Sequence, residues 1–173
     1  FLGVGLPLAR PAVAAGVGDK AQFIRGDIFE TDFSKAQVLT LFLLPSLNLR
    51  LRPTILNMTP GTRVVSNSFT MEAWQPDETV NVGGDCTSWC TAHMWIVPAK
   101  AAGTWQLGSN PLTLTQEFQM LTGTLGTTAI SDAKLRGSEI TFTAGGTKYT
   151  GQVSGNAMKG TTAAGTAWTA TKK

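Results

Sequence analysis

The run Val38–Leu44, VLTLFLL, restricts the fold more than any other feature of this chain, because it is apolar at nearly every position. Continuous apolar runs of this kind are typical of strands covered on both faces of a parallel sheet. A second strand is expected over Arg63–Phe69. The stretch between the two predicts a helix that is capped by Ser46 and runs to about Met58. A strand, a helix and a strand of these lengths predict a βαβ unit.

Further strands are expected on either side of this unit. Ala21–Ile24 predicts a strand that stops at Gly26-Asp27, and Thr79–Val82 with Ala92–Val97 predict a closing pair. A carboxylate just past a buried strand is a common ligand position in open α/β sheets. Asp is also common in solvated turns and at helix N-caps, and the residues alone favour such a role for Asp27 over a ligand contact.

The pattern changes after about residue 100, where short alternating segments replace the continuous apolar runs. The dipeptide Gly145-Gly146 separates two such segments and predicts a two-residue hairpin. The segments expected to form strands are Gly103–Leu107, Leu112–Met120, Ser138–Ala144, Lys148–Val153 and Ala167–Thr171. The chain is therefore expected to combine an α/β part with an antiparallel β meander or partial barrel over residues 101–173.

Residues 1–15 are apolar and end in Ala12-Val13-Ala14, a small-x-small pattern that signal peptidases accept. The segment is too short to span a bilayer. It predicts a signal peptide and an exported, periplasmic protein. The alternative is a core strand followed by a loop. The expected organisation is a signal-like segment over 1–15, an α/β domain over 16–100 and the β extension over 101–173.

The two cysteines, Cys86 and Cys90, stand four positions apart between two predicted strands. In an oxidising compartment they can form a disulfide, and free thiols remain an alternative. His93 and Asp85 would complete a set of zinc ligands only poorly, because structural zinc usually takes four Cys or His ligands. No metal site is predicted. The net charge of +3 comes from thinly spread basic residues, and no nucleic-acid partner is predicted either.

One stretch, GDIFETDFSKAQVLTLFLLPSLNLRLRPTILNMTPGTRVVSNSFTMEAW, resembles the second half of class I S-adenosylmethionine-dependent methyltransferases. It is similar to bacterial, often exported, members and, around LLPSLN, to mitochondrial-type protein lysine methyltransferases. The resemblance implies a Rossmann-like methyltransferase sheet. It also implies S-adenosylmethionine as the cofactor and a protein lysine or a small molecule as the methyl acceptor.

The resemblance also implies roles for individual residues. Asp27 matches the acidic position that accepts a hydrogen bond from the adenine amino group, and Ile28 and Phe29 match the apolar positions beside the ring. The loop after the next strand is where the methyl donor meets the acceptor. The positions it contributes are Leu44 to the cofactor and Pro45, Ser46 and Asn48 to the substrate.

This family places an acidic-x-Gly-x-Gly loop and a further acidic residue before the strand that matches Ala21–Ile24, and the residues upstream of Phe23 contain no such pattern. We therefore expect a truncated sheet with an exposed apolar edge near Val38–Leu44 and a tendency to self-associate. Methyl transfer would fail if the glycine loop is missing. The alternative function is that of a non-enzymatic exported protein that binds a ligand or partner through its β meander.

Overall fold

A computed structural model describes residues 12–173, which fall into two units, one that ends at residue 33 and one over residues 34–173. In the first unit, residues 12–14 form a helical turn and residues 21–25 have no regular secondary structure. The strand predicted at Ala21–Ile24 is therefore wrong; Ile24 is 73% exposed, and four apolar-leaning residues do not form a strand without a paired neighbour. Most of the predicted signal segment, residues 1–11, lies outside the described residues.

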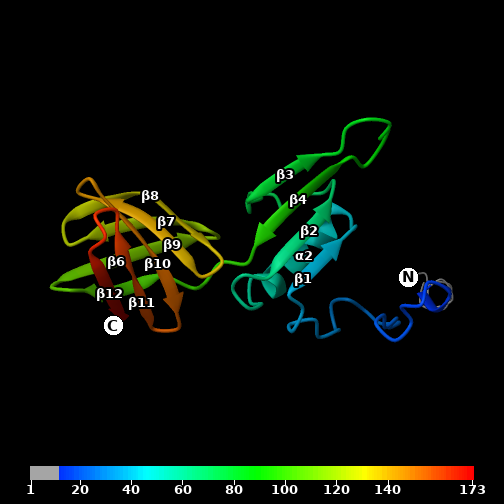
Figure 1. The fold of residues 1–173 in the computed structure, drawn as a ribbon, viewed down its shortest axis with the longest axis horizontal. Helices are drawn as coiled ribbons and strands as arrows, with labels where there is room; N and C mark the ends of the chain where they lie inside the picture. The colour runs from blue at the N-terminus through cyan, green and yellow to red at the C-terminus, as the bar shows by residue number, and fades with distance from the viewer. Residues whose placement is uncertain (1–11) are drawn as a thin grey trace. The chain divides into compact units, whose positions relative to one another are not determined.

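The second unit begins with a mixed four-stranded sheet in the order β1-β2-β4-β3 (Figure 1). Its strands are β1 (Val38–Leu41), β2 (Arg63–Asn67), β3 (Glu78–Asn81) and β4 (Thr91–Ile96). β1 pairs with β2 in parallel, with Val38 opposite Arg63, and β4 runs antiparallel between β2 and β3. The strand–helix–strand unit and the closing strand pair expected from the sequence are both present, although β1 and the connecting helix each end three residues earlier than predicted.

β1 forms an edge of this sheet, and one of its faces is exposed at Val38 and Thr40 while Leu41 on the other face is buried, which corrects the expectation of a strand covered on both faces. It pairs with β2 on one side only. Val38, Phe42 and Leu44 are 45%, 62% and 61% exposed. The apolar run thus forms the exposed apolar edge that was expected near Val38–Leu44. Self-association through this edge stays a prediction.

The helix α2 (Pro45–Ile55) connects β1 to β2 and places Asn48, Leu51 and Ile55 in buried positions. The N-cap is Leu44 and not Ser46, and no side chain caps the helix. Pro45 occupies the first turn, where a fixed φ favours helix initiation and a missing N–H costs nothing. α2 is the one α-helix of residues 34–173, so a layered Rossmann-like layout stays a prediction.

The rest of the unit is a closed eight-stranded antiparallel barrel in the order β10-β11-β12-β5-β6-β7-β8-β9 (Figure 1). The predicted meander is confirmed, and the barrel is closed and not partial. The predicted hairpin at Gly145-Gly146 joins β9 to β10. The strands are β5 (Gly103–Leu107), β6 (Asn110–Glu117), β7 (Met120–Leu125), β8 (Thr128–Arg136), β9 (Glu139–Ala144), β10 (Thr147–Ser154), β11 (Ala157–Thr162) and β12 (Ala167–Lys172).

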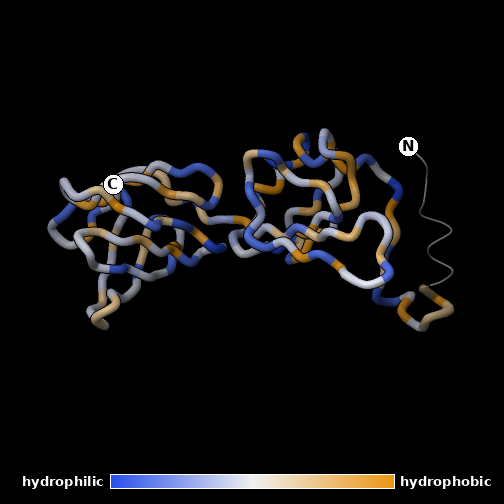
Figure 2. Tube along the Cα trace, turned by 90° about the horizontal axis from the view of Figure 1, so that it is seen from above, coloured by the Kyte–Doolittle hydropathy of each residue, from blue (hydrophilic) through white to orange (hydrophobic). Residues whose placement is uncertain are grey.

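Alternating inward residues fill the barrel with one hydrophobic core, and Figure 2 shows hydrophobic and hydrophilic residues mixed along its backbone. Phe142 stacks on Tyr149 with ring centroids 4.7 Å apart, and Trp168 packs edge-on against Phe142 at 6.0 Å. Gly151 and Gly160 are paired across β10 and β11. A Cβ on Gly160 would overlap the Thr150 carbonyl oxygen, so strands β10 and β11 approach each other more closely here than a side chain would allow.

The segment that leads from β4 into the barrel is held by the side chain of Gln116. Its Oε1 accepts the Ala101 N–H at 2.7 Å, and its Nε2 donates to the carbonyls of Ala99 at 2.9 Å and Phe118 at 2.7 Å. Trp105 is fully buried, and its Nε1 donates to the Ala101 carbonyl at 2.8 Å. Across residues 12–173 we find no helix with the length and apolarity that a bilayer crossing requires.

Candidate functional site

The carboxyl ends of the parallel strands β1 and β2 are the natural position for a site, because open α/β sheets bind ligands at that edge. Leu44, Pro45 and Ser46 follow β1 here and are all exposed. The N–H groups of Leu47 and Asn48 both bond to the Leu44 carbonyl, at 2.9 and 3.1 Å. The helix therefore starts without a side-chain cap at the surface of the sheet's edge.

Asn48, predicted to bind substrate, is fully buried. Its Nδ2 donates to the Ser66 hydroxyl at 3.1 Å and lies 3.3 Å from the Phe69 carbonyl and 3.5 Å from that of Thr70. Its Oδ1 is buried without a hydrogen-bond partner. These contacts tie the start of α2 to the segment that leaves β2, so Asn48 positions that segment.

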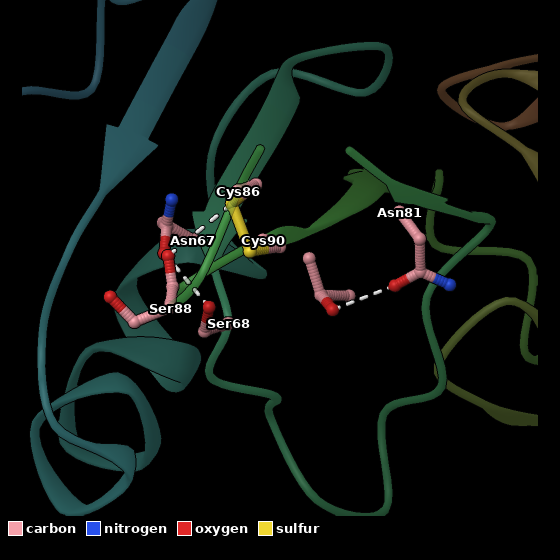
Figure 3. Close-up of a disulfide and its surroundings, with 7 residues drawn as sticks. Asn67, Ser68, Asn81, Cys86, Ser88 and Cys90 are labelled. Atoms are coloured by element: carbon pink, nitrogen blue, oxygen red, sulfur yellow. Dashed lines mark hydrogen bonds between the residues drawn. A yellow bond between two sulfur atoms is a disulfide. The ribbon is translucent and has the colours of Figure 1, made fainter. Parts of the chain in front are cut away.

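A disulfide joins Cys86 to Cys90 at the tip of the β3–β4 connection, with the two Cα atoms 5.8 Å apart (Figure 3). The short loop that it closes holds Trp89 with φ at 58°, in the left-handed region that large side chains rarely adopt. Trp89 is 55% exposed. The disulfide thus closes a loop whose tryptophan side chain is about half exposed.

Three aromatic rings meet at the carboxyl ends of β1 and β2, and the sequence alone did not predict that they form a group. Phe42 directly follows β1 and Phe69 lies two residues past β2. The ring centroid of Phe42 lies 6.4 Å from that of Phe69 and 5.7 Å from that of Trp89, and the Phe69–Trp89 distance is 5.3 Å. We call these residues, Phe42, Phe69 and Trp89, the aromatic cluster. The one signal for it in the sequence is a tryptophan inside a cysteine-bounded turn, where apolar residues are uncommon.

Asp27, Ile28 and Phe29 belong to the other unit. The exposed Asp27 carboxylate accepts the Phe29 N–H through Oδ1 at 2.9 Å, and the Asp27 carbonyl accepts the Thr31 hydroxyl at 2.7 Å. This is an Asx turn, in which the side chain stabilises the backbone of its own loop. Ile28 and Phe29 are half-buried. The proposed contacts of the three residues with adenine stay predictions.

No three His, Cys, Asp or Glu side chains among residues 12–173 gather as a metal ion would require. His93 lies in β4, where its Nδ1 is 3.0 Å from the Thr79 hydroxyl and its ring packs against Trp95. Asp77, which precedes β3, has a carboxyl group with an altered pKa. Partial desolvation raises the pKa of Asp77, and the Ile96 N–H, which donates to it at 2.7 Å, opposes that shift.

Comparison with known proteins gives matches that cover part of the chain. Residues 7–78 match the family model of the ANTKMT methyltransferase domain. A protein-lysine N-methyltransferase from Saccharolobus islandicus (strain REY15A) is 43% identical over 68 residues, which is 39% of this chain and 42% of that protein. The crystal structure of an RNA methyltransferase from Salinibacter ruber in complex with S-adenosyl-L-homocysteine is 46% identical, with a TM-score of 0.48. That similarity covers 53% of this chain and 57% of the other.

The chain thus spans about two fifths of the curated relative's length. The matched family segment contains Asp27, β1, α2 and β2, and it ends before β4 and the whole barrel. The resemblance inferred from the sequence is confirmed at the level of a methyltransferase, while the exported subtype and the truncation stay predictions.

Proposed function

We propose that this chain is part of an S-adenosylmethionine-dependent methyltransferase whose acceptor is a lysine side chain of a protein. The observation that carries the proposal is the 43% identity over 68 residues to a protein-lysine N-methyltransferase. The family match over residues 7–78 supports the same class.

The residues present suit the methyl donor in their chemistry. A carboxylate offers about four lone-pair sites, and Asp27 uses one oxygen on the Phe29 N–H, so capacity remains for the adenine amino group. Ile28 and Phe29 supply apolar surface for the ring. In the other unit, Leu44 offers an exposed apolar side chain at the start of α2.

When bound, S-adenosylmethionine supplies an electrophilic methyl group on a sulfonium sulfur. The chain's own contribution is then to hold the acceptor nitrogen in line with that methyl group and to exclude water from it. The acceptor ammonium group would have to lose a proton to solvent before its nitrogen could attack, and the transfer then needs no nucleophilic side chain from the protein.

Calorimetric titration of the full chain with S-adenosylmethionine tests the proposal, followed by transfer of a labelled methyl group to a lysine-rich protein. Asp27→Ala should weaken cofactor binding about tenfold, the value of one hydrogen bond to a charged group. Glu30→Ala is the matched control, since Glu30 is an exposed carboxylate in the same loop, and it should bind as the unaltered chain does. The absence of heat at millimolar cofactor would refute the proposal.

We also propose a periplasmic location, which the Cys86–Cys90 disulfide supports because disulfides persist in oxidising compartments. Labelling of thiols in intact cells before and after reduction tests it. Cysteines that react without a reductant would contradict an oxidising location.

A further inference from the structure

The aromatic cluster places two large apolar side chains in water at the edge where the sheet is expected to bind ligands. Phe42 is 62% exposed and Trp89 is 55% exposed. The chain's other four tryptophans, Trp74, Trp95, Trp105 and Trp168, are at most 7% exposed. Aromatic side chains contribute large buried areas when they are covered, so exposing two of them together forgoes stability and points to a ligand that covers them.

The structure holds this arrangement in place from several sides. The Cys86–Cys90 disulfide closes the loop that carries Trp89, whose backbone lies in the left-handed region. Buried Asn48 lies within hydrogen-bonding distance of the backbone carbonyl of Phe69. Ser68, also left-handed with φ at 59°, donates its N–H to the Thr91 carbonyl at 2.7 Å. Strained backbone positions that the surroundings fix are characteristic of functional sites.

The charge around the cluster selects the kind of ligand. The three segments that carry the rings, residues 42–49, 66–71 and 83–90, contain one charged residue, Asp85, and no lysine or arginine. A nucleic acid would need basic side chains beside the stacking rings to neutralise its phosphates. The composition of these segments suits a cation better than an anion: their one charged side chain is a carboxylate, and the guanidinium of Arg52, which reaches the Met71 carbonyl at the end of the second segment, is bound there at 2.9 Å.

The rings present π surfaces in different orientations, with the planes of Phe42 and Trp89 inclined at 72° and those of Phe69 and Trp89 at 52°. Tryptophan gives the strongest cation–π attraction of the aromatic residues. A lysine side chain matches such a surface in two ways, since its four-carbon stem covers apolar area and its ammonium group contacts the ring faces.

We propose that the aromatic cluster is the docking site for the acceptor lysine, with Trp89 as its principal contact. This inference rests on the proposed methyltransferase function and names the residues that receive its substrate. The disulfide is part of the site, because it sets the backbone position from which Trp89 reaches Phe42 and Phe69.

Tryptophan fluorescence of the full chain tests the proposal, because Trp89 is the tryptophan that solvent quenchers reach. A short peptide containing trimethyllysine should protect the fluorescence from acrylamide, and the same peptide with norleucine, which keeps the stem and lacks the ammonium, should bind roughly tenfold more weakly. A lysine peptide should protect in the same way at higher concentration.

Variants locate the binding on the cluster. Phe42→Ala should weaken protection roughly tenfold, and the double variant Cys86→Ser with Cys90→Ser should weaken it in the same direction. Met120→Ala is the matched control, since Met120 is 54% exposed on the barrel strand β7, and it should leave protection unchanged. Unchanged thermal unfolding of Phe42→Ala would show that the loss is one of binding.

Calorimetry with S-adenosylmethionine on the same preparation separates this inference from the function on which it rests. Cofactor binding with no protection of Trp89 by either cationic peptide would overturn the docking site and leave the methyltransferase proposal intact. Protection by the peptides without cofactor binding would support the docking site and refute the proposed function. Stronger protection by a single-stranded oligoribonucleotide than by the peptides would overturn the lysine assignment in favour of base stacking.

Discussion

Replacement of Asn48 tests whether this residue binds substrate or holds the sheet's edge together. In the structure its side chain has no access to solvent, and it connects α2 to Ser66 and to the carbonyls of Phe69 and Thr70. We expect Asn48→Ala to destabilise the fold before it affects any ligand.

The magnitude follows from the contacts. The Nδ2 group has two hydrogens, so it makes at most two good bonds among its three acceptors, each with a net contribution of about 1 kcal/mol. The amide's removal also leaves a small cavity, at a cost of about 1 kcal/mol or more. Because Oδ1 has no partner, its removal returns part of this loss. The free energy of unfolding should fall by about 2 kcal/mol.

Urea unfolding followed by far-UV circular dichroism measures this change. Asn48→Asp should be more destabilising than Asn48→Ala, since it places a buried carboxylate against two carbonyl oxygens. Ser46→Ala, at an exposed position in the same helix turn, should unfold within about 0.5 kcal/mol of the unaltered chain. An Asn48→Ala variant as stable as the Ser46→Ala control would refute the structural role argued for this side chain.

Three further predictions concern the barrel and the sheet edge. Gly160→Ala should destabilise by about 3 kcal/mol or more through overlap with the neighbouring strand, whereas Gly83→Ala, where the added Cβ meets nothing within 4 Å, should be nearly neutral; chemical denaturation compares them. Gln116→Leu should lower the unfolding free energy by about 2–3 kcal/mol, because it leaves the Ala101 N–H and the Ala99 carbonyl without their hydrogen-bond partner. A change below about 0.5 kcal/mol would contradict this. Light scattering should show association of the unaltered chain that Phe42→Ser reduces, and a monodisperse monomer would rule out self-association through this edge.

The hairpin between β9 and β10 was the most predictable part of the barrel, because local turn chemistry marks it. Gly145-Gly146 supplies two residues with positive φ between β9 and β10, as a two-residue hairpin requires. The strands β7, β8 and β11 were not predicted. In β8 the alternation is interrupted where Asp132 takes a φ of 50° and the pairing with β9 shifts between Ser131 and Lys134. A bulge moves the inward face by one residue and so hides the period of two.

The order of the strands and the helix in the sheet was predicted correctly, but the coverage of its first strand was not. A run such as Val38–Leu44 shows that a segment avoids water, but it contains no information on whether a neighbour covers it on one side or both. The site was less predictable still, because Phe42, Phe69 and Trp89 come from three separate segments. Only the parallel pairing of β1 with β2, and the β3–β4 connection, bring those segments together.

Asn48 matches a position of the substrate loop and yet is buried, and its contact with the aromatic cluster explains how it can still affect substrate binding. The Asn48 side chain lies against the backbone of Phe69, and Phe69 packs against both exposed rings of the cluster. A substitution at Asn48 would therefore loosen the docking surface from behind, without removing any atom that a lysine would touch. If this is correct, the fraction of Asn48→Ala that remains folded should bind the trimethyllysine peptide more weakly while its affinity for the norleucine peptide changes little, because misplaced rings lose cation–π contact sooner than apolar contact. Equal weakening for both peptides would show instead that Asn48 supports the fold alone.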